Sequence, residues 1–266
     1  MQAAVVQGSD ALRNNFKSLD RAAEQAVSEQ AHILVTPEMF LTGYNIGAAA
    51  VRAAAEGRDG KLLQRVAELA AAHQIAIVVG FPELARDGAV YNSAAFIGAD
   101  GSILSVYQKT HLFGAVDRAQ FSAGSALPKP FSYLGWKISL AICYDIEFPE
   151  LARDYAKGGA DIVLVPTANM APFTRVATHM VPVRAQENVM YVAYANYVGS
   201  EGEFDYCGLS CLCDPLGDDI ARAGVDSATL IYGSVSRQVL LDARKTTTYL
   251  QDRRCDLYSA GENNCE

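Results

Sequence analysis

The chain has 266 residues, of which 50% are hydrophobic and 20% are charged, and this balance is sufficient to bury a large core. It excludes a disordered or fibrous protein. The formal net charge of -8 and the sequence pI of about 5.1 leave no basic stripe for a polyanion, so nucleic acid is not expected as a partner.

The N-terminal apolar run ends before Gly8 and is followed by polar residues. It is therefore too short for the apolar core of a signal peptide or for a membrane span. We therefore expect a cytoplasmic protein without membrane association. Six cysteines in a chain of this length do not suggest a disulfide framework. Three of them, Cys207, Cys211 and Cys213, lie close together, but they lack C-x-x-C spacing and a nearby histidine. Their alternation fits a strand, and we expect no metal there.

The first half of the chain alternates between short apolar strands and amphipathic helices before it changes to a hairpin. The predicted elements are a strand at 3–7, a helix at 12–30, a strand at 33–37, a helix at 60–73 and strands at 75–80, 91–97 and 103–109. Asp100-Gly101 between the last two strands is a strong turn signal. The loop that follows, as far as residue 124, carries Asp117.

The second half continues with strands and helices in alternation. The predicted elements are a strand at 136–143, a helix at 148–157, a strand at 161–166, a helix at 175–188, strands at 191–197, 206–213, 220–222 and 230–235, and a helix at 237–245. No Pro/Gly-rich linker and no internal repeat interrupts them. We predict one α/β domain over residues 1–258, with one mixed sheet or two packed sheets flanked by helices, and a flexible tail at 259–266.

Cys143 ends an apolar strand, and Pro149 follows at the start of a helix. Such a junction is expected to expose the sulfur beside free backbone N–H groups, which favour a thiolate and hold a developing oxyanion. Alone, a cysteine at a strand end is more often a buried, inert thiol. Glu38 and Lys109, however, also follow strands directly, and ligands of open α/β sheets bind at that edge.

Three segments together resemble the catalytic blocks of the nitrilase superfamily of carbon–nitrogen hydrolases. They are residues 36–44, 107–113 and 142–150, in the order and spacing of that family. The resemblance extends from residue 1 to about residue 258. It implies a four-layer αββα sandwich in which Glu38, Lys109 and Cys143 converge in one pocket. It also implies a homodimer or a higher homo-oligomer, and a reaction that needs neither a metal nor an organic cofactor.

The same resemblance implies a role for each residue. Cys143 would be the nucleophile, and Glu38 would carry the proton from the thiol to the leaving amine. Lys109 and the N–H of Tyr144 would stabilise the oxyanion. Many members carry a second glutamate where this chain has Asp117. This shorter carboxylate would orient Lys109 or touch the substrate, and an ordinary surface aspartate is the alternative.

Further residues near the strand ends are candidates for substrate contact. Tyr44, Phe113, Asn169 and Met170 would line a partly apolar acyl pocket, with core or rim packing as the alternative for each. His111 has the chemistry of a base, but a hydrogen-bonded structural histidine fits its place beside two apolar residues better.

The residues after Cys143 indicate the branch of the superfamily. They include neither the asparagine and paired arginines typical of carbamoylases nor the tryptophan and glutamate typical of nitrilases. We therefore expect an amidase that releases ammonia from small linear amides, whether aliphatic, aromatic or derived from amino acids. The alternatives are an N-carbamoyl amine or acid hydrolase, a nitrilase and, from another class, a non-catalytic scaffold that binds a metabolite or a partner protein.

Overall fold

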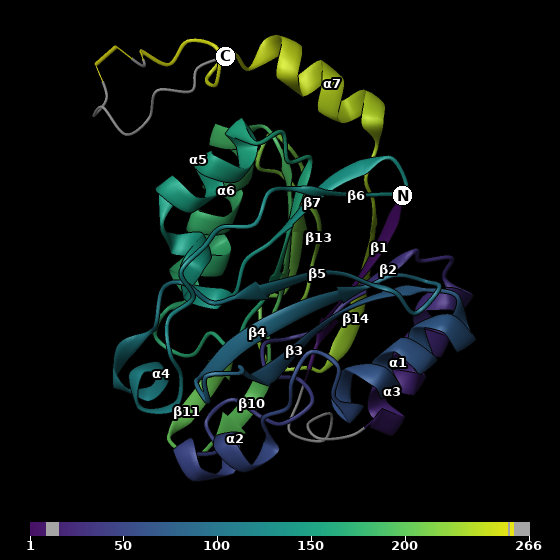
Figure 1. Cartoon of the computed structure of the whole chain (residues 1–266). Coiled ribbons are helices and arrows are strands. Elements are labelled where there is room, and N and C mark those ends of the chain that lie inside the picture. Colours follow the sequence, from purple (N-terminus) through teal and green to yellow (C-terminus); the bar gives the residue numbers. More distant parts are fainter. Residues whose placement is uncertain (9–15, 255, 258–266) are drawn as a thin grey trace.

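The computed structural model describes residues 1–8, 16–254 and 256–257. Its centre is a pair of six-stranded mixed sheets packed face to face (Figure 1). The first sheet comprises, in spatial order, β14 (Thr229–Ser234), β1 (Gln2–Gln7), β2 (Ile33–Val35), β3 (Ala76–Leu84), β4 (Val90–Ile97) and β5 (Ile103–Gln108). The second comprises β13 (Asp219–Arg222), β12 (Cys211–Cys213), β9 (Tyr191–Ala195), β8 (Ile162–Pro166), β7 (Trp136–Leu140) and β6 (Phe131–Tyr133).

Alternation along the strands divides the interior into three apolar layers. Val5 and Val35 of the first sheet meet Leu140 and Leu164 of the second in the layer between the sheets. The opposite faces pack against helices. The first sheet is covered by α1 (Phe16–Ser28) and α3 (Lys61–His73), and the second by α5 (Pro149–Lys157) and α6 (Val181–Asn188). The predicted αββα sandwich is therefore confirmed.

The carboxyl ends of several strands from both sheets meet at one edge of the sandwich. The strands β1, β2 and β3 are parallel, as are β7, β8 and β9. A parallel bridge between Gly8 and Tyr197 places the ends of β1 and β9 side by side. The backbone N–H of Glu38 donates to the carbonyl of Thr167 at 3.2 Å, which joins the ends of β2 and β8. Segments far apart in the sequence therefore converge where ligands bind in such folds.

Several elements differ from the prediction. The strand predicted at 206–213 is broken at Gly208 and Leu209, which both have a left-handed backbone (φ 61°). Its first part, β11 (Phe204–Cys207), pairs with β10 (Val198–Glu201) in a separate two-stranded sheet, whereas β12 joins the second large sheet. The short helices α2 (Ala48–Ala54) and α4 (Gly114–Gln120) were not predicted, nor were β6 and β10. The predicted helix at 175–188 begins as a π-turn, η3 (Val176–Met180).

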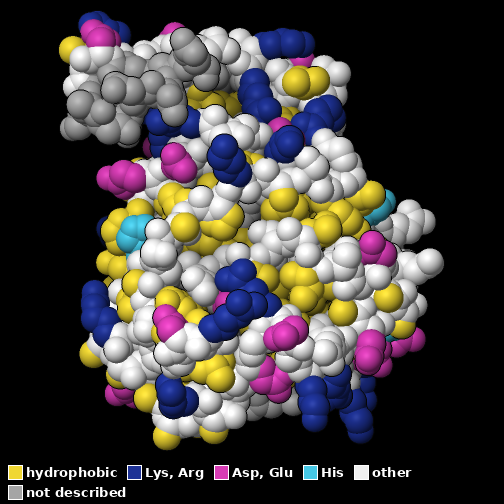
Figure 2. All heavy atoms as spheres, in the orientation of Figure 1, with side chains coloured by type: hydrophobic (Ala, Val, Ile, Leu, Met, Phe, Trp, Pro, Cys, Tyr) yellow, Lys and Arg dark blue, Asp and Glu magenta, His cyan; other side chains and the backbone are white. Residues whose placement is uncertain are grey.

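The last helix, α7 (Arg237–Thr246), lies across one end of the sandwich, apart from the four layers (Figure 1). Side chains of both charge signs are interspersed over the face shown in Figure 2. None of the helices in the described ranges combines the length and apolarity needed to cross a bilayer. The expected start of the first helix at residue 12 and the tail at 259–266 lie outside the described residues.

Candidate active site

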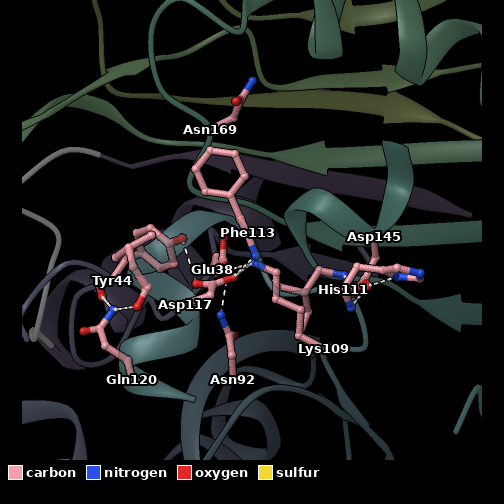
Figure 3. Close-up of polar contacts among 12 residues, drawn as sticks. Glu38, Tyr44, Asn92, Lys109, His111, Phe113, Asp117, Gln120, Asp145 and Asn169 are labelled. Carbon is pink, nitrogen blue, oxygen red and sulfur yellow. Dashed lines mark hydrogen bonds and ion pairs between the residues drawn. The ribbon is translucent and has the colours of Figure 1, made fainter. Parts of the chain in front are cut away.

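Glu38 follows β2 and is fully buried. Its Oε1 accepts hydrogen bonds from Asn92 Nδ2 at 2.6 Å and from Lys109 Nζ at 2.8 Å, whereas Oε2 has no partner among the described residues (Figure 3). Tyr197 donates its hydroxyl to the carbonyl of Glu38 at 2.8 Å, so the backbone is fixed as well. Burial raises the pKa of Glu38, although Lys109 opposes the shift. The result is a rigid carboxylate with one oxygen available to accept a proton.

The loop that carries Glu38 depends on a glycine in the neighbouring strand. A Cβ at Gly80 would lie 2.3 Å from the backbone nitrogen of Met39, a distance that no side chain tolerates. Gly80 thus allows β3 to pass directly beneath the loop. The sequence position of this glycine, in the middle of an apolar strand, already indicates a close backbone approach.

Lys109 follows β5 and has no solvent-exposed side-chain surface. Its ammonium lies 2.8 Å from Glu38 Oε1 and 2.7 Å from Asp117 Oδ2. Burial lowers the pKa of Lys109, but the carboxylates of Asp117 and Glu38 outweigh this and hold the pKa well above its usual value. The side chain therefore stays charged. Because an ammonium has three N–H donors, one remains for a substrate oxygen.

Asp117 lies on α4 and is fully buried, so it is not the surface aspartate that remained an alternative. Its Oδ1 accepts from the Tyr44 hydroxyl at 2.8 Å, and its Oδ2 accepts from the Phe113 N–H at 2.8 Å in addition to the Lys109 ammonium. Figure 3 shows these groups converging on the Glu38–Lys109 pair. Asp117 therefore orients Lys109 together with Glu38.

Cys143 begins the 3-10 turn η2 (Cys143–Glu147) with a left-handed backbone, φ 49°. Such a conformation costs a non-glycine residue about 1–3 kcal/mol and is concentrated at functional sites. The expected exposure of the sulfur is wrong, because Cys143 is only 9% exposed. Burial and the charge of Glu38 raise the pKa of the thiol well above its usual value, against a lowering by Lys109. Burial and Glu38 thus favour the neutral thiol, whereas Lys109 favours the thiolate that the sequence led us to expect.

The N–H of Tyr144 has no acceptor among the residues that the structure describes. It is the second N–H of the turn that begins at Cys143, where first-turn donors have no partner within the helix. The turn thus carries the nucleophile and a free donor side by side. This is the arrangement that an oxyanion requires.

Asp145, whose function was not predicted, joins the turn of Cys143 to the end of β5. Its carboxylate is fully buried and accepts from the backbone N–H of Ile142 at 3.1 Å. From the other segment it accepts hydrogen bonds from Tyr107 Oη at 2.8 Å, Thr110 Oγ1 at 3.0 Å and the backbone N–H of His111 at 2.9 Å. Since Lys109 lies between these residues in the chain, Asp145 fixes the distance between the lysine and the cysteine.

His111 occupies the hydrogen-bonded structural position predicted for it. Its Nδ1 lies 2.8 Å from Asp145 Oδ1, and its ring stacks on Phe148 with 3.9 Å between centroids. Through these two contacts, the His111 ring helps to hold the segment after β5 against the turn that begins at Cys143.

Replacing Asp145 with asparagine is expected to lower the free energy of unfolding by about 1.5–3 kcal/mol. The reason is that one oxygen of a charged carboxylate, which accepts hydrogen bonds, becomes an amide nitrogen that can only donate. Activity should fall as well, since the Lys109 segment loses its anchor. Urea unfolding and steady-state kinetics check both effects. The matched control is Asp154→Asn on the exposed face of α5, which should change neither. Equal behaviour of the two variants would contradict the role assigned to Asp145.

The predicted substrate residues have different surroundings. Tyr44 is buried with its hydroxyl on Asp117, Met170 packs in the core beside the first sheet, and Asn169 donates to the carbonyl of Phe173 at 3.0 Å. The side chain of Asn169 lies beyond the ring of Phe113, away from the carboxylates, in Figure 3. Phe113 is half-buried and borders a surface cavity of about 550 Å³.

A band of aromatic rings continues from Phe113. Its ring makes edge contacts with Tyr144 at 5.4 Å and with Phe173 at 5.8 Å between centroids, and Tyr144 in turn contacts Phe148 at 4.9 Å. We call Phe113, Tyr144, Phe148 and Phe173 the aromatic band. Two of its members belong to the segment that starts with Cys143, so the band lies beside the candidate nucleophile.

The clustered cysteines lie in two separate places. Cys207 donates to the carbonyl of Asn169, whereas the sulfurs of Cys211 and Cys213 are 3.9 Å apart and lie near Asp219. Both oxygens of Asp219 accept hydrogen bonds from Arg222 at 2.6 Å. The carboxylate charge is therefore already paired with a guanidinium.

Comparisons with known proteins agree with this geometry. The family model described as carbon-nitrogen hydrolase matches residues 2–245. A protein of Pseudomonas protegens named "Hydrolase in pqqF 5'region" is 49% identical over 92% of this chain and 85% of its own length. An (R)-stereoselective amidase of Pseudomonas sp. is 34% identical over 84% of this chain and 79% of its own. A solved structure of an amidase variant from Nesterenkonia sp. AN1 is also similar; it shows the acetamide moiety of fluoroacetamide on the active-site cysteine of that protein. The TM-score is 0.81 at 32% sequence identity, and the match covers 97% of this chain and 95% of that one.

Proposed function

The chain belongs to the carbon–nitrogen hydrolase family of the nitrilase superfamily, and on this premise we propose that it hydrolyses small linear carboxamides to carboxylates and ammonia. The observation that carries the proposal is that Oε2 of Glu38 has no partner among the described residues, while Glu38 and Lys109 both act on the pKa of the buried Cys143 thiol. A general base needs an oxygen that is not already occupied by another donor. Glu38 has one, while its other oxygen is held by Asn92 and Lys109.

In the first half of the reaction, Glu38 takes the proton of Cys143 as the sulfur attacks the carbonyl carbon. The new C–S bond places negative charge on the carbonyl oxygen, which accepts from the third N–H of Lys109 and from the N–H of Tyr144. Where measured, one such donor contributes about 3–4 kcal/mol to transition-state stabilisation. Glu38 then returns the proton to the amide nitrogen, the C–N bond breaks and ammonia leaves.

In the second half, a water molecule takes the place of the ammonia. Glu38 removes a proton from this water as its oxygen attacks the thioester carbon. The C–S bond then breaks, the sulfur regains the proton from Glu38, and the product leaves as a carboxylic acid, which loses its remaining proton to give the carboxylate. Because Lys109 keeps its charge throughout, the same cation serves both tetrahedral intermediates.

A panel of amides, N-carbamoyl compounds and nitriles with matched acyl groups tests the proposal. We expect ammonia release from the amides to exceed that from the other two classes, because the residues after Cys143 offer no paired arginines for a carbamoyl acid. Turnover confined to nitriles, or to carbamoyl compounds, would contradict the linear-amide assignment. Absence of turnover with all three classes would favour the non-catalytic scaffold instead.

A further inference from the structure

The loop between β2 and α2 carries residues of the site at both of its ends. Glu38 follows β2, and further along the loop Tyr44 donates its hydroxyl to Asp117 at 2.8 Å. The loop contains neither a helix nor a strand, so many of its backbone N–H groups need acceptors from outside it. The group that accepts from Tyr44 and Asn45 therefore decides where this end of the loop lies.

Glu201, the last residue of β10, is that acceptor. Its Oε1 accepts from the Tyr44 N–H at 3.2 Å, and its Oε2 accepts from the Asn45 N–H at 2.9 Å. Oε2 also accepts from the hydroxyl of Tyr206, and the side chain is buried. Hydrogen bonds to an ionised carboxylate are stronger than those between neutral groups. Two of them on successive N–H groups fix both the position and the direction of the backbone.

The two-stranded sheet that carries Glu201 is itself anchored to the rest of the protein. The N–H of Ala171, which lies beyond β8, donates to the carbonyl of Asp205 in β11 at 2.8 Å. The ring of Tyr206 lies against the ring of Tyr197, with 5.2 Å between their centroids. The carboxylate of Glu201 thus has a support that does not depend on the loop it binds.

The peptide group on the other side of Tyr44 is held by α4. Gln120 Nε2 donates to the Tyr44 carbonyl at 3.3 Å, so the backbone of Tyr44 is fixed on both sides (Figure 3). Its hydroxyl meets Asp117, and its ring centroid lies 5.7 Å from the Lys109 ammonium. Asp117 binds that same ammonium at 2.7 Å. A chain of contacts therefore runs from Glu201 through one ring and one carboxylate to Lys109.

We propose that Glu201 is a positioning residue, which places the Lys109 ammonium for the oxyanion by way of Tyr44 and Asp117. This inference rests on the proposed amide hydrolysis and adds to it a residue from outside the catalytic segments. The contact between Lys109 and the carbonyl oxygen strengthens as charge develops on that oxygen. Loss of the position should therefore lower kcat and leave KM nearly unchanged.

A double-mutant cycle of Glu201→Gln with Tyr44→Phe tests the proposal. The glutamine replaces one acceptor oxygen with an NH₂ group that cannot accept, and the phenylalanine removes the hydroxyl that contacts Asp117. We expect Glu201→Gln alone to lower kcat about tenfold or more and to leave KM within about twofold. In the Tyr44→Phe background the same change should lower kcat less than about twofold, because both variants break one chain of contacts.

The rates are measured with the amide that the panel above finds to be hydrolysed fastest, and kcat is given per folded protein from circular dichroism. The matched control is Asp161→Asn, which alters another buried carboxylate that accepts from a backbone N–H and from arginines. Asp161 precedes β8, at the opposite edge of the sheets from the site. Its variant should unfold at a lower urea concentration and keep kcat within about twofold.

Crystal structures of the wild-type protein and of Glu201→Gln give a readout that does not depend on activity. In the variant, the Tyr44 hydroxyl should lie outside hydrogen-bond distance of Asp117. If no amide releases ammonia, the proposed function fails, and the two structures still decide whether Glu201 positions Tyr44. Equal loss of kcat in both backgrounds, an unchanged kcat in the single variant, or a Tyr44 hydroxyl that stays on Asp117 would overturn the inference.

Discussion

Replacing Cys143 with alanine is expected to reduce amide hydrolysis by about 10⁴–10⁶-fold, as for other enzymes that lose their nucleophile. No acyl-enzyme can form without the sulfur. The free energy of unfolding should change by no more than about 1–2 kcal/mol, because the substitution removes a single heavy atom, the sulfur, from the buried side chain. Ammonia release and urea unfolding check the two parts of this prediction.

The matched control is Cys213→Ala, which removes another buried thiol in the layer between the second sheet and its helices. This variant should retain activity. Mass spectrometry after brief treatment with iodoacetamide provides an independent test. Because Glu38 can take the proton of Cys143, the wild-type protein and Cys213→Ala should each gain one adduct, at Cys143, that the Cys143→Ala protein lacks. A persistent adduct at another residue of the Cys143→Ala protein, together with turnover, would assign the chemistry to a different nucleophile.

Replacing Lys109 with methionine is expected to damage both stability and catalysis. Two buried carboxylates, Glu38 and Asp117, would face each other without a cation, which costs about 3–5 kcal/mol when one partner of a buried pair is removed. Loss of the oxyanion donor should reduce kcat about 10²–10³-fold in the protein that remains folded. Urea unfolding and steady-state kinetics measure the two effects, and Lys137→Met on an exposed position of β7 is the control.

A double variant separates the two effects of Lys109. Adding Asp117→Asn to Lys109→Met removes one of the two opposed carboxylates and should restore a large part of the lost stability. It should not restore activity, because no cation returns to the oxyanion. Recovery of turnover in the double variant would show that Lys109 has a structural role only and is not needed for catalysis.

The layers of the fold could be predicted from the sequence because apolar alternation and helical spacing are strong in the elements that form them. Strands such as β3 and helices such as α3 bury regular apolar patterns. The helix α4 has no such pattern, since its buried residues are Asp117 and Gln120, which serve polar partners. The break after β11 was missed for a similar reason, because Cys207 and Cys211 continue an alternation that the backbone at Gly208 and Leu209 interrupts.

The site was predictable in its three central residues and less so in their surroundings. Glu38, Lys109 and Cys143 each follow a strand, and their segments resemble a known family. Asn92 gave only a weak signal, as one amide within a strand that is otherwise largely apolar, yet it holds Glu38 at 2.6 Å. The state of the thiol also depends on burial and on neighbouring charges, which local sequence does not contain.

The catalytic residues lie where the two sheets meet, at the ends of β2, β5 and β7. Enzymatic activity therefore reports whether the two sheets have docked. Glu38 and Lys109 come from one sheet and Cys143 from the other, so neither half of the chain holds a working fragment of the catalyst. During refolding, enzymatic activity should therefore return only when the two sheets dock. The helical signal in far-ultraviolet circular dichroism should recover before that. A newly made chain would therefore have no amidase activity until both sheets have been synthesised and have docked.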